Sequence, residues 1–217
     1  MTKIFIPQTQ QLDEKAASAK GELIPLMPSG NKSGLEPDRI KFLMVKALSS
    51  FNDGDYLLLD GRNTYCMVAA SILSVLRNSI DILIWNSSSS DYVSRMLTFM
   101  DIPSPKPIVS DSRAFLVNDM HAGIEVPMQS IVLTKGSDPD FMSPENIKTK
   151  MANILKNSHE HDYILCSGSR LHNVVASSIM ARMHRRVNYL LWNPKSSRYE
   201  RRSAIYSNES IQEILSR

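Results

Sequence analysis

The sequence contains an internal duplication. Residues 37–95 align without a gap to residues 144–202, at an offset of 107 positions. The two segments share 20 identities in 59 aligned positions, and the two tryptophans of the chain, Trp85 and Trp192, fall on one aligned pair. We therefore expect two copies of one folding unit, related by a pseudo-twofold axis as the subunits of a homodimer would be.

Within each copy the hydrophobic pattern alternates between the periods of strands and of helices. We expect a strand, a helix opened by a proline, a buried strand, an alanine-rich helix and a last buried strand. These elements fall at 22–26, 37–50, 56–59, 64–77 and 80–85, and again at 130–133, 144–157, 163–166, 171–185 and 187–192. A leading strand is expected at 3–7 and 113–117, at a slightly different offset.

The buried strands are apolar on both faces, which is typical of parallel strands covered by helices. The sequence therefore predicts an α/β fold of two tandem β-α-β-α-β units with mainly parallel sheets, in a three-layer, pseudo-twofold arrangement. The first repeat is assigned to residues 1–100 and the second to 113–206. A proline-rich connector at 101–112 separates them, and a polar tail follows at 207–217.

Composition excludes several classes of protein. No run of apolar residues is long enough for a membrane helix or a signal peptide, so we expect a cytoplasmic protein, in the host cytoplasm if it is viral. Cys66 and Cys166 are the only cysteines, without a Cys-x-x-Cys pair or histidines at zinc spacing. We expect two reduced thiols, no metal site and no cofactor.

Several short motifs resemble small uncharacterised α/β proteins of bacteriophages. The residues that carry the resemblance are Lys3-Ile4-Phe5, Gly21-Glu22-Leu23, Pro28-Ser29-Gly30, the Asp55-Tyr56-Leu57-Leu58-x-x-Gly61 segment, and Trp85-Asn86 through Tyr92. The second copy repeats the later part from Asp162 to Tyr199, and Asn86 and Asn193 stand where those proteins carry aspartate. The resemblance implies viral origin and a compact α/β fold, and it brings no assigned activity.

The two copies differ most in charge. From residue 170 to residue 202 the net charge is +7, whereas the equivalent stretch 63–95 is neutral. The basic residues are Arg170, Arg182, Arg185, Arg186, Lys195, Arg198, Arg201 and Arg202. Such a cluster is typical of a surface that binds nucleic-acid phosphates, with Tyr199 and Tyr206 available to stack on bases. It is equally typical of a solvated surface that pairs with acids of the other copy.

The loops after the central strands form a second candidate site, because open parallel sheets bind ligands beyond the carboxyl ends of their strands. These loops are Asp60-Gly61-Arg62-Asn63 and Ser167-Gly168-Ser169-Arg170. A tight strand-to-helix turn explains Gly61 and Gly168 as well as a phosphate site does. Catalysis would need converging groups, such as a base beside Asp60 or His172 beside Ser167, and the sequence contains no such constellation.

The positions shared by both copies suggest scaffold rather than chemistry. We expect Trp85 and Trp192 to anchor the core, and Asn86 and Asn193 to set the turns that follow. The preferred hypothesis is a non-enzymatic phage-type binding protein whose basic second repeat contacts nucleic acid or an acidic host protein. The alternatives are a viral assembly protein that self-associates, and a nucleotide-binding sensor or enzyme that uses the two glycine loops.

Overall fold

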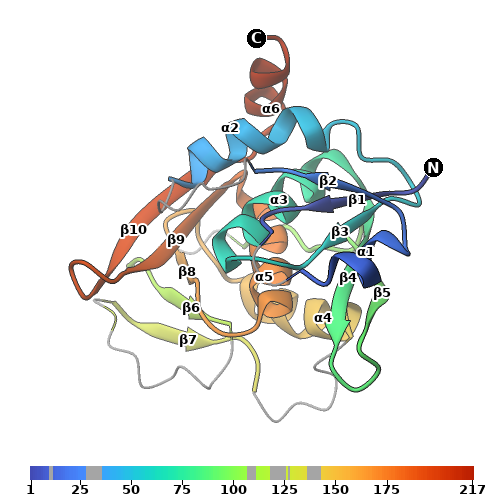
Figure 1. The fold of residues 1–217 in the computed structure, drawn as a ribbon. Helices are drawn as coiled ribbons and strands as arrows, with labels where there is room; N and C mark the ends of the chain where they lie inside the picture. Colours follow the sequence, from blue (N-terminus) through green and yellow to red (C-terminus); the bar gives the residue numbers. More distant parts are fainter. Residues whose placement is uncertain (10–11, 28–35, 107–110, 118–125, 127, 136–142) are drawn as a thin grey trace.

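The computed structural model describes the chain except for residues 10–11, 28–35, 107–110, 118–125, 127 and 136–142. Two five-stranded sheets enclose a layer of helices (Figure 1). The first repeat contains β1 (Lys3–Ile6), α1 (Glu14–Ser18), β2 (Glu22–Pro25), α2 (Pro37–Leu48), β3 (Tyr56–Leu58), α3 (Asn63–Leu76), β4 (Ser79–Asn86) and β5 (Asp91–Thr98). The second contains β6 (Ala114–Leu116), β7 (Ser130–Val132), α4 (Pro144–Leu155), β8 (Tyr163–Leu165), α5 (Arg170–His184), β9 (Arg186–Asn193) and β10 (Arg198–Ile205), followed by α6 (Asn208–Leu215).

The two sheets have the same strand order, β2-β1-β3-β4-β5 and β7-β6-β8-β9-β10, which confirms the predicted two-unit α/β fold. All neighbouring strands are parallel except the last pair of each sheet. The register also explains the different offset of the leading strands. Ile4 lies opposite Tyr56 and Ala114 opposite Tyr163, so β1 and β6 correspond at an offset of 110 residues.

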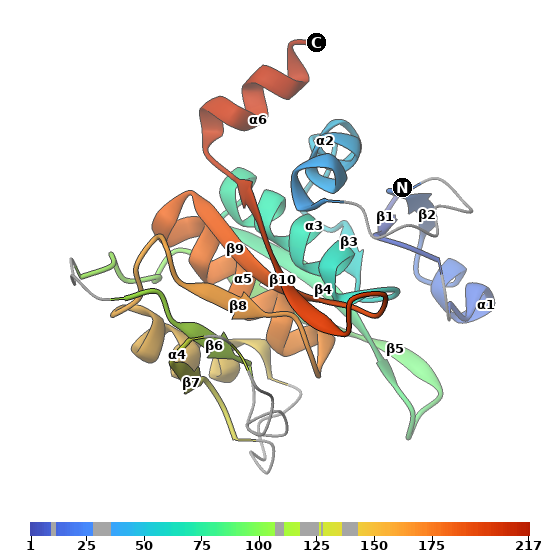
Figure 2. The same cartoon turned by 90° about the vertical axis from the view of Figure 1, so that its left-hand side faces the viewer.

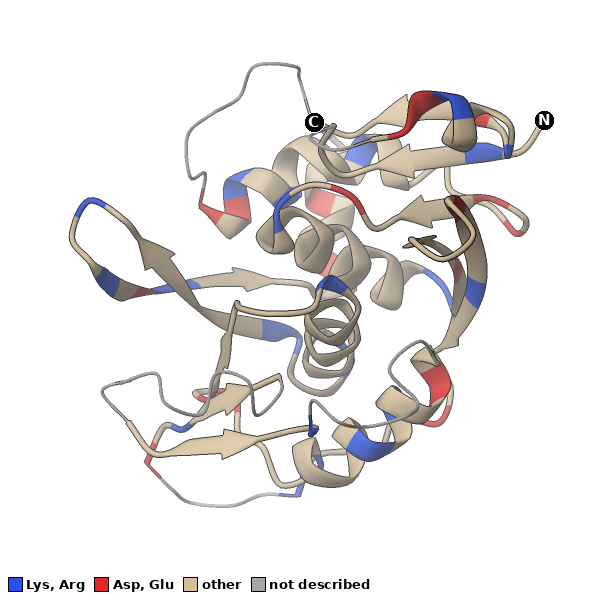
Figure 3. Ribbon diagram, turned by 60° about the horizontal axis from the view of Figure 1, so that its bottom comes forward, with Lys and Arg blue, Asp and Glu red and all other residues tan. Residues whose placement is uncertain are grey.

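The helices lie mainly between the sheets rather than on both faces of each sheet (Figure 3). Helices α3 and α5 occupy the centre and contact each other across the pseudo-twofold axis. Their shared Val-Ala and Ser-Ile pairs, at 68–69 and 71–72 and again at 175–176 and 178–179, are fully buried. Small residues let the two helices approach closely, and Ser177 Oγ donates a hydrogen bond to the carbonyl of Met67 at 3.3 Å. One hydrophobic cluster contains residues of both repeats, so the repeats share a core.

The shared lysines of the outer helices tie each repeat to the other. Lys41 Nζ on α2 donates to the carbonyl of Ile205 at 2.7 Å, at the end of β10. Lys148 Nζ on α4 donates to Thr98 Oγ1 at 2.6 Å, at the end of β5. Thr98 and Ile205 are equivalent positions, so the pseudo-twofold axis accounts for a lysine at the same place in both copies.

The shared aspartate before each central strand organises the edge of its sheet. Asp55 Oδ1 accepts from the backbone amide of Lys3 at 2.8 Å, and its Oδ2 from that of Asn52 at 2.9 Å. Asp162 makes the same pair of bonds with the amides of Arg113 and His159, both at 2.8 Å. Asp162 additionally forms an ion pair with the Arg113 guanidinium at 2.7 Å. Both carboxylates are buried structural groups.

Some local expectations were wrong. Trp85 and Trp192 do not anchor the core, because their side chains are 40% and 52% exposed. Each lies near the end of a strand that turns into an unexpected antiparallel strand, β5 or β10, and residues 208–215 of the expected tail form a helix. The predicted turns are confirmed, since Asn86 Oδ1 accepts from the amide of Ser88 and Asn193 Oδ1 from that of Lys195.

Ser143 caps α4, and its side chain accepts a hydrogen bond from the amide of Asn146. The Pro28-Ser29-Gly30 motif lies outside the described residues. Within the part of the chain that the structure describes, no helix is long and apolar enough to cross a bilayer.

Candidate functional site

The two glycine loops meet at the pseudo-twofold axis. Asn63 and Arg170 are equivalent residues that open α3 and α5, and each reaches across to the other repeat. Asn63 Nδ2 donates to the carbonyl of Gly168 at 3.0 Å, and Arg170 Nε donates to the carbonyl of Gly61 at 2.7 Å. Both glycines have positive φ, +88° at Gly61 and +73° at Gly168, which turns these carbonyls toward the partner loop. The sequence-predicted loops therefore form one junction.

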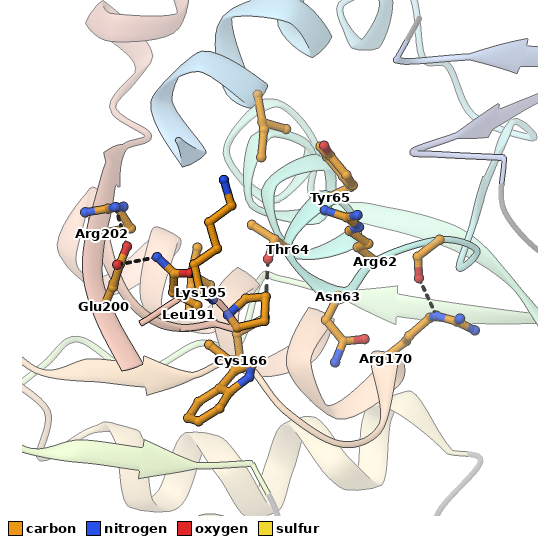
Figure 4. Close-up of a pocket in the computed structure, with 15 residues that line it drawn as sticks. Arg62, Asn63, Thr64, Tyr65, Cys166, Arg170, Leu191, Lys195, Glu200 and Arg202 are labelled. Atoms are coloured by element: carbon orange, nitrogen blue, oxygen red, sulfur yellow. Dashed lines mark hydrogen bonds and ion pairs between the residues drawn. The ribbon is translucent and has the colours of Figure 1, made fainter. Parts of the chain in front are cut away.

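A cleft of about 840 Å³ opens beside this junction (Figure 4). One wall is the start of α3 with its preceding loop, and the other is the β9–β10 hairpin of the second repeat. The lining residues are Ile40, Gly61, Arg62, Asn63, Thr64, Tyr65, Cys166, Arg170, Leu191, Trp192, Asn193, Pro194, Lys195, Glu200 and Arg202. Its volume lies within the usual range of small-molecule sites, and its walls come from both repeats.

The cleft is predominantly cationic. Four of its residues are positively charged, Arg62, Arg170, Lys195 and Arg202, against the single carboxylate of Glu200. Figure 4 shows Lys195 extending from the β9–β10 turn toward the middle of the cleft. Its ammonium forms no ion pair with any described residue. The interior therefore favours an anionic occupant.

Glu200 is held in its ionised form. Asn193 Nδ2 donates to its Oε1 at 2.5 Å, and Arg202 contacts its Oε2 at 2.5 Å. The Asn193 hydrogen bond is the main cause of a lowered Glu200 pKa, and the Arg202 charge adds to it. Since Arg202 also pairs with Glu36 at 2.8 Å, these groups form a fixed wall of the hairpin. Lys195, which forms no ion pair with a described residue, is the cleft cation best placed to bind an anion.

The start of α3 adds to the positive potential. Its cap residue, Arg62, makes no side-chain capping bond, and the first turn contains no acid. The first turn of α5 likewise has no acid, whereas α2, α4 and α6 each have one there. Unpaired amides and the helix dipole favour an anion at such an end.

The thiols of the junction are structural. Cys66 Sγ donates to the carbonyl of Asp60 at 3.2 Å, and Asn173, its counterpart, donates to the carbonyl of Ser167 at 2.6 Å. Burial raises the pKa of Cys66 to about 12 and that of Cys166 to about 11. Both stay protonated at neutral pH, so neither is an activated nucleophile. Within the described residues no cluster of His, Cys, Asp and Glu could hold a metal ion.

The structure divides the eight basic residues of the second repeat among several surfaces. Arg170, Lys195 and Arg202 line the cleft. Arg186 and Arg201 lie with Arg202 around a separate hollow at the edge of the second sheet. The other three are placed as follows: Arg182 lies near the end of α5 beside the segment from Phe99 to Pro105, Arg185 ends α5, and Arg198 begins β10.

Of the two tyrosines proposed to stack on bases, Tyr206 is unavailable. It is fully buried, and its hydroxyl shares a hydrogen bond of 2.7 Å with that of Tyr189. Tyr199 is half-buried and contacts Trp192 edge to face, with ring centroids 5.2 Å apart.

Sequence reasoning missed part of the cleft. Thr64 and Tyr65 follow the predicted loop directly, so the signal for them was their place in the first helical turn. Asn193 was predicted only to set a turn, and Glu200 lies in the basic stretch 170–202 without having been predicted as a site residue. A single acidic residue among many basic ones is expected to form an ion pair with one of them, and this expectation could have drawn attention to Glu200. Ile40 and Leu191 carry no signal, because apolar residues that line a cleft have the same pattern as core residues.

Comparison with models of protein families identifies one family that matches the chain. The model of the phage Pam3 gp32-like protein matches residues 2–98 and 129–204, which include most of both repeats. The chain belongs to this phage Pam3 gp32-like family. Membership confirms the bacteriophage resemblance at the level of the family. A comparison with curated proteins gives no match.

Among solved structures, this phage Pam3 gp32-like chain is similar to a SAVED/CARF-domain containing receptor, Cap4 of Acinetobacter baumannii, whose structure contains the cyclic trinucleotide 2′3′3′-cAAA. The TM-score is 0.50 at 13% identity, over 93% of the present chain. The chain spans about half of the receptor, 50% of its length. At this identity the likeness concerns the fold, and it extends across both repeats.

Proposed function

We propose that this phage protein is a non-enzymatic binding protein that holds a small anionic nucleotide, of the cyclic oligonucleotide class, in the cleft between its repeats. The observation that carries the proposal is the junction of the two glycine loops beside a cationic cleft of about 840 Å³. Phosphates would lie between the start of α3 and Lys195, because the first turn of α3 contains no acid and Lys195 forms no ion pair with a described residue. The similarity of fold to a receptor with a bound cyclic trinucleotide supports this ligand class.

The difference between the copies supports a single site. At the positions equivalent to Arg62 and Lys195, the other copy has Ser169 and Ser88. Lys195 and Arg170 of this cleft are thus part of the charge difference between the repeats, and Arg62 is a cation of the first copy alone. A ligand on this surface would be held asymmetrically, with a stoichiometry of one per chain, although the scaffold is pseudo-symmetric.

Three of the eight basic residues, Arg170, Lys195 and Arg202, line the proposed nucleotide site. For these three residues we propose a small nucleotide as the partner, in place of the nucleic acid or acidic host protein expected from the sequence. Arg186 and Arg201 lie outside the cleft.

A thermal-shift screen tests the proposal. The panel contains cyclic mono-, di- and trinucleotides, linear nucleotides and inorganic phosphate, with Lys195→Ser as the variant. We expect at least one cyclic nucleotide to raise the unfolding temperature of the native protein, and a smaller shift for Lys195→Ser. A flat response across the panel, or an equal shift with phosphate alone, would contradict the proposal.

A further inference from the structure

The second sheet has an aromatic outer face, the face turned away from the helices. Residues that alternate along a strand share a face, so Leu190 and Trp192 of β9 lie together with Tyr199 and Arg201 of β10. In Figure 2 strands β8, β9 and β10 lie toward the viewer, in front of α3 and α5. Leu190 packs in a small outer cluster against Tyr199, while Trp192 is 52% exposed. The exposed Trp192 ring is thus supported by the half-buried Tyr199 on the same face of the sheet.

Cations stand on the same face. The guanidinium of Arg201 lies 5.5 Å from the centre of the Tyr163 ring, which is stacking distance for a cation on an aromatic. Arg186 shares this face of β9, and both arginines are exposed. Neither forms an ion pair with a described residue. Together with Tyr163 they line a hollow of about 570 Å³ at the sheet edge.

The acids of that hollow are already neutralised. Glu36 is paired with Arg202 at 2.8 Å, and Asp38 with Lys41 at 3.3 Å. The positive charges of Arg186 and Arg201 are therefore not cancelled by the acidic side chains beside them. The outer face combines uncompensated cations with exposed aromatic rings.

The first repeat provides an internal comparison, because α1 covers its outer face. Ala17 of α1 is buried in the outer cluster, the amide of Asp13 donates to the hydroxyl of Tyr92 at 3.4 Å, and Lys20 pairs with Asp91 at 2.8 Å. The positions of Arg186 and Arg201 are Ser79 and Ser94 there. In the second repeat no described helix covers this face, and Val126 and Met128 are the described residues of the β6–β7 connection that pack against its outer cluster. Among the described residues, the second copy thus has exposed arginines on β9 and β10 where the first has serines beneath α1.

We infer that the outer face of β8–β10 binds single-stranded nucleic acid, with bases stacked on Trp192 and Tyr199 and phosphates held by Arg186 and Arg201. Aromatic rings on a sheet face stack unpaired bases regardless of sequence, and arginines contribute both charge pairing and planar contact. Leu191 and Glu200, which line the cleft, lie on the opposite side of the sheet, whereas Trp192 borders both the cleft and this face. Arg186 and Arg201 do not line the cleft, so variants of these arginines distinguish this second binding surface from the proposed nucleotide site.

Fluorescence anisotropy with labelled single-stranded DNA and RNA of about 15 nucleotides tests the inference. We expect binding to single strands that is tighter than to a duplex of the same length, and that weakens steeply between about 50 and 200 mM salt. Arg201→Ser introduces the residue of the first copy and leaves the cleft lining intact. It should weaken binding about tenfold, and Trp192→Ala by a similar factor, through lost stacking.

The first copy supplies the matched control. Trp85 is also exposed, and it contacts Tyr92 edge to face at 5.1 Å, so Trp85→Ala removes a comparable ring from the covered repeat. Trp85→Ala should leave binding unchanged, and Trp192→Phe should retain most of it, with thermal unfolding checking that each variant is folded. Absence of binding at low salt, equal losses from Trp85→Ala and Trp192→Ala, or equally effective competition by polyglutamate would overturn the inference.

Discussion

Arg170 and Asn63, equivalent residues of the two repeats, each donate a hydrogen bond to the glycine carbonyl of the opposite loop. The distances are 2.7 Å to Gly61 and 3.0 Å to Gly168. The reciprocal bonds fix the ends of α3 and α5 relative to each other, and they place the loops of both repeats at the edge of one cleft. The junction therefore joins the two repeats and forms one edge of the cleft.

Removing these bonds should lower stability. Asn63→Ala and Arg170→Ala are each expected to reduce the free energy of unfolding by about 1–2 kcal/mol, because each leaves a loop carbonyl without its donor. Urea denaturation followed by circular dichroism measures the effect. Arg198→Ala, at the exposed start of β10, is the control and should change it by no more than about 0.5 kcal/mol. Equal effects for all three variants would count against a specific junction.

The sequence allowed the strands and helices of the two repeats to be predicted, but not which residues meet at the cleft or are exposed on the outer face. The offset of 107 positions predicted the repeat, its parallel strands and the two loops, since apolar periodicity and glycine positions are local signals. The exposure of Trp85 and Trp192 could not be predicted, because an aromatic at a strand end has the same sequence pattern whether the next strand covers it or not. The cleft also depends on which residues of one copy meet the other, and Glu200 and Tyr65 are brought to it only by the tertiary arrangement.

The two shared aspartates should differ in importance. Asp162→Ala is expected to cost about 3 kcal/mol, because it removes the side-chain acceptor of two backbone amides and leaves the largely buried Arg113 without its carboxylate. Asp55→Ala is expected to cost about 2 kcal/mol, since its described bonds are to backbone amides. Urea denaturation of both variants tests the order. Exposed Asp53→Ala is the control, and a larger loss for Asp55→Ala than for Asp162→Ala would contradict it.

His184 should make stability depend on pH. Its Nε2 lies 2.7 Å from Ser158 Oγ, and burial lowers its pKa below the ordinary value of 6.5. The unfolded chain therefore binds more protons than the folded one as the pH falls below about 6.5. The stabilisation is present above that pH and is lost as pH falls toward the lower folded pKa. The difference between the unfolding free energies at about pH 7.5 and pH 5.5 should be smaller in His184→Gln than in the wild type. An equal difference in both proteins would exclude His184 as the source of the pH dependence.

Both cysteines should resist alkylation in the folded protein. Burial raises the pKa of Cys66 to about 12 and that of Cys166 to about 11, so thiolate is scarce at neutral pH. Iodoacetamide labelling followed by mass spectrometry should modify neither residue rapidly in buffer and both in urea. Rapid native labelling of Cys66 would show that the α3–α5 junction opens.

The single nucleotide site between the repeats is tested by isothermal titration calorimetry, with the cyclic nucleotide that gives the largest thermal stabilisation. We expect one ligand per chain. Arg62→Ser and Lys195→Ser each introduce the residue of the other copy, and each should weaken binding about tenfold. Arg95→Ala, the counterpart of cleft residue Arg202 in the first repeat, should bind like the wild type. Two ligands per chain, or unchanged affinity in both cleft variants, would contradict a single nucleotide site between the repeats.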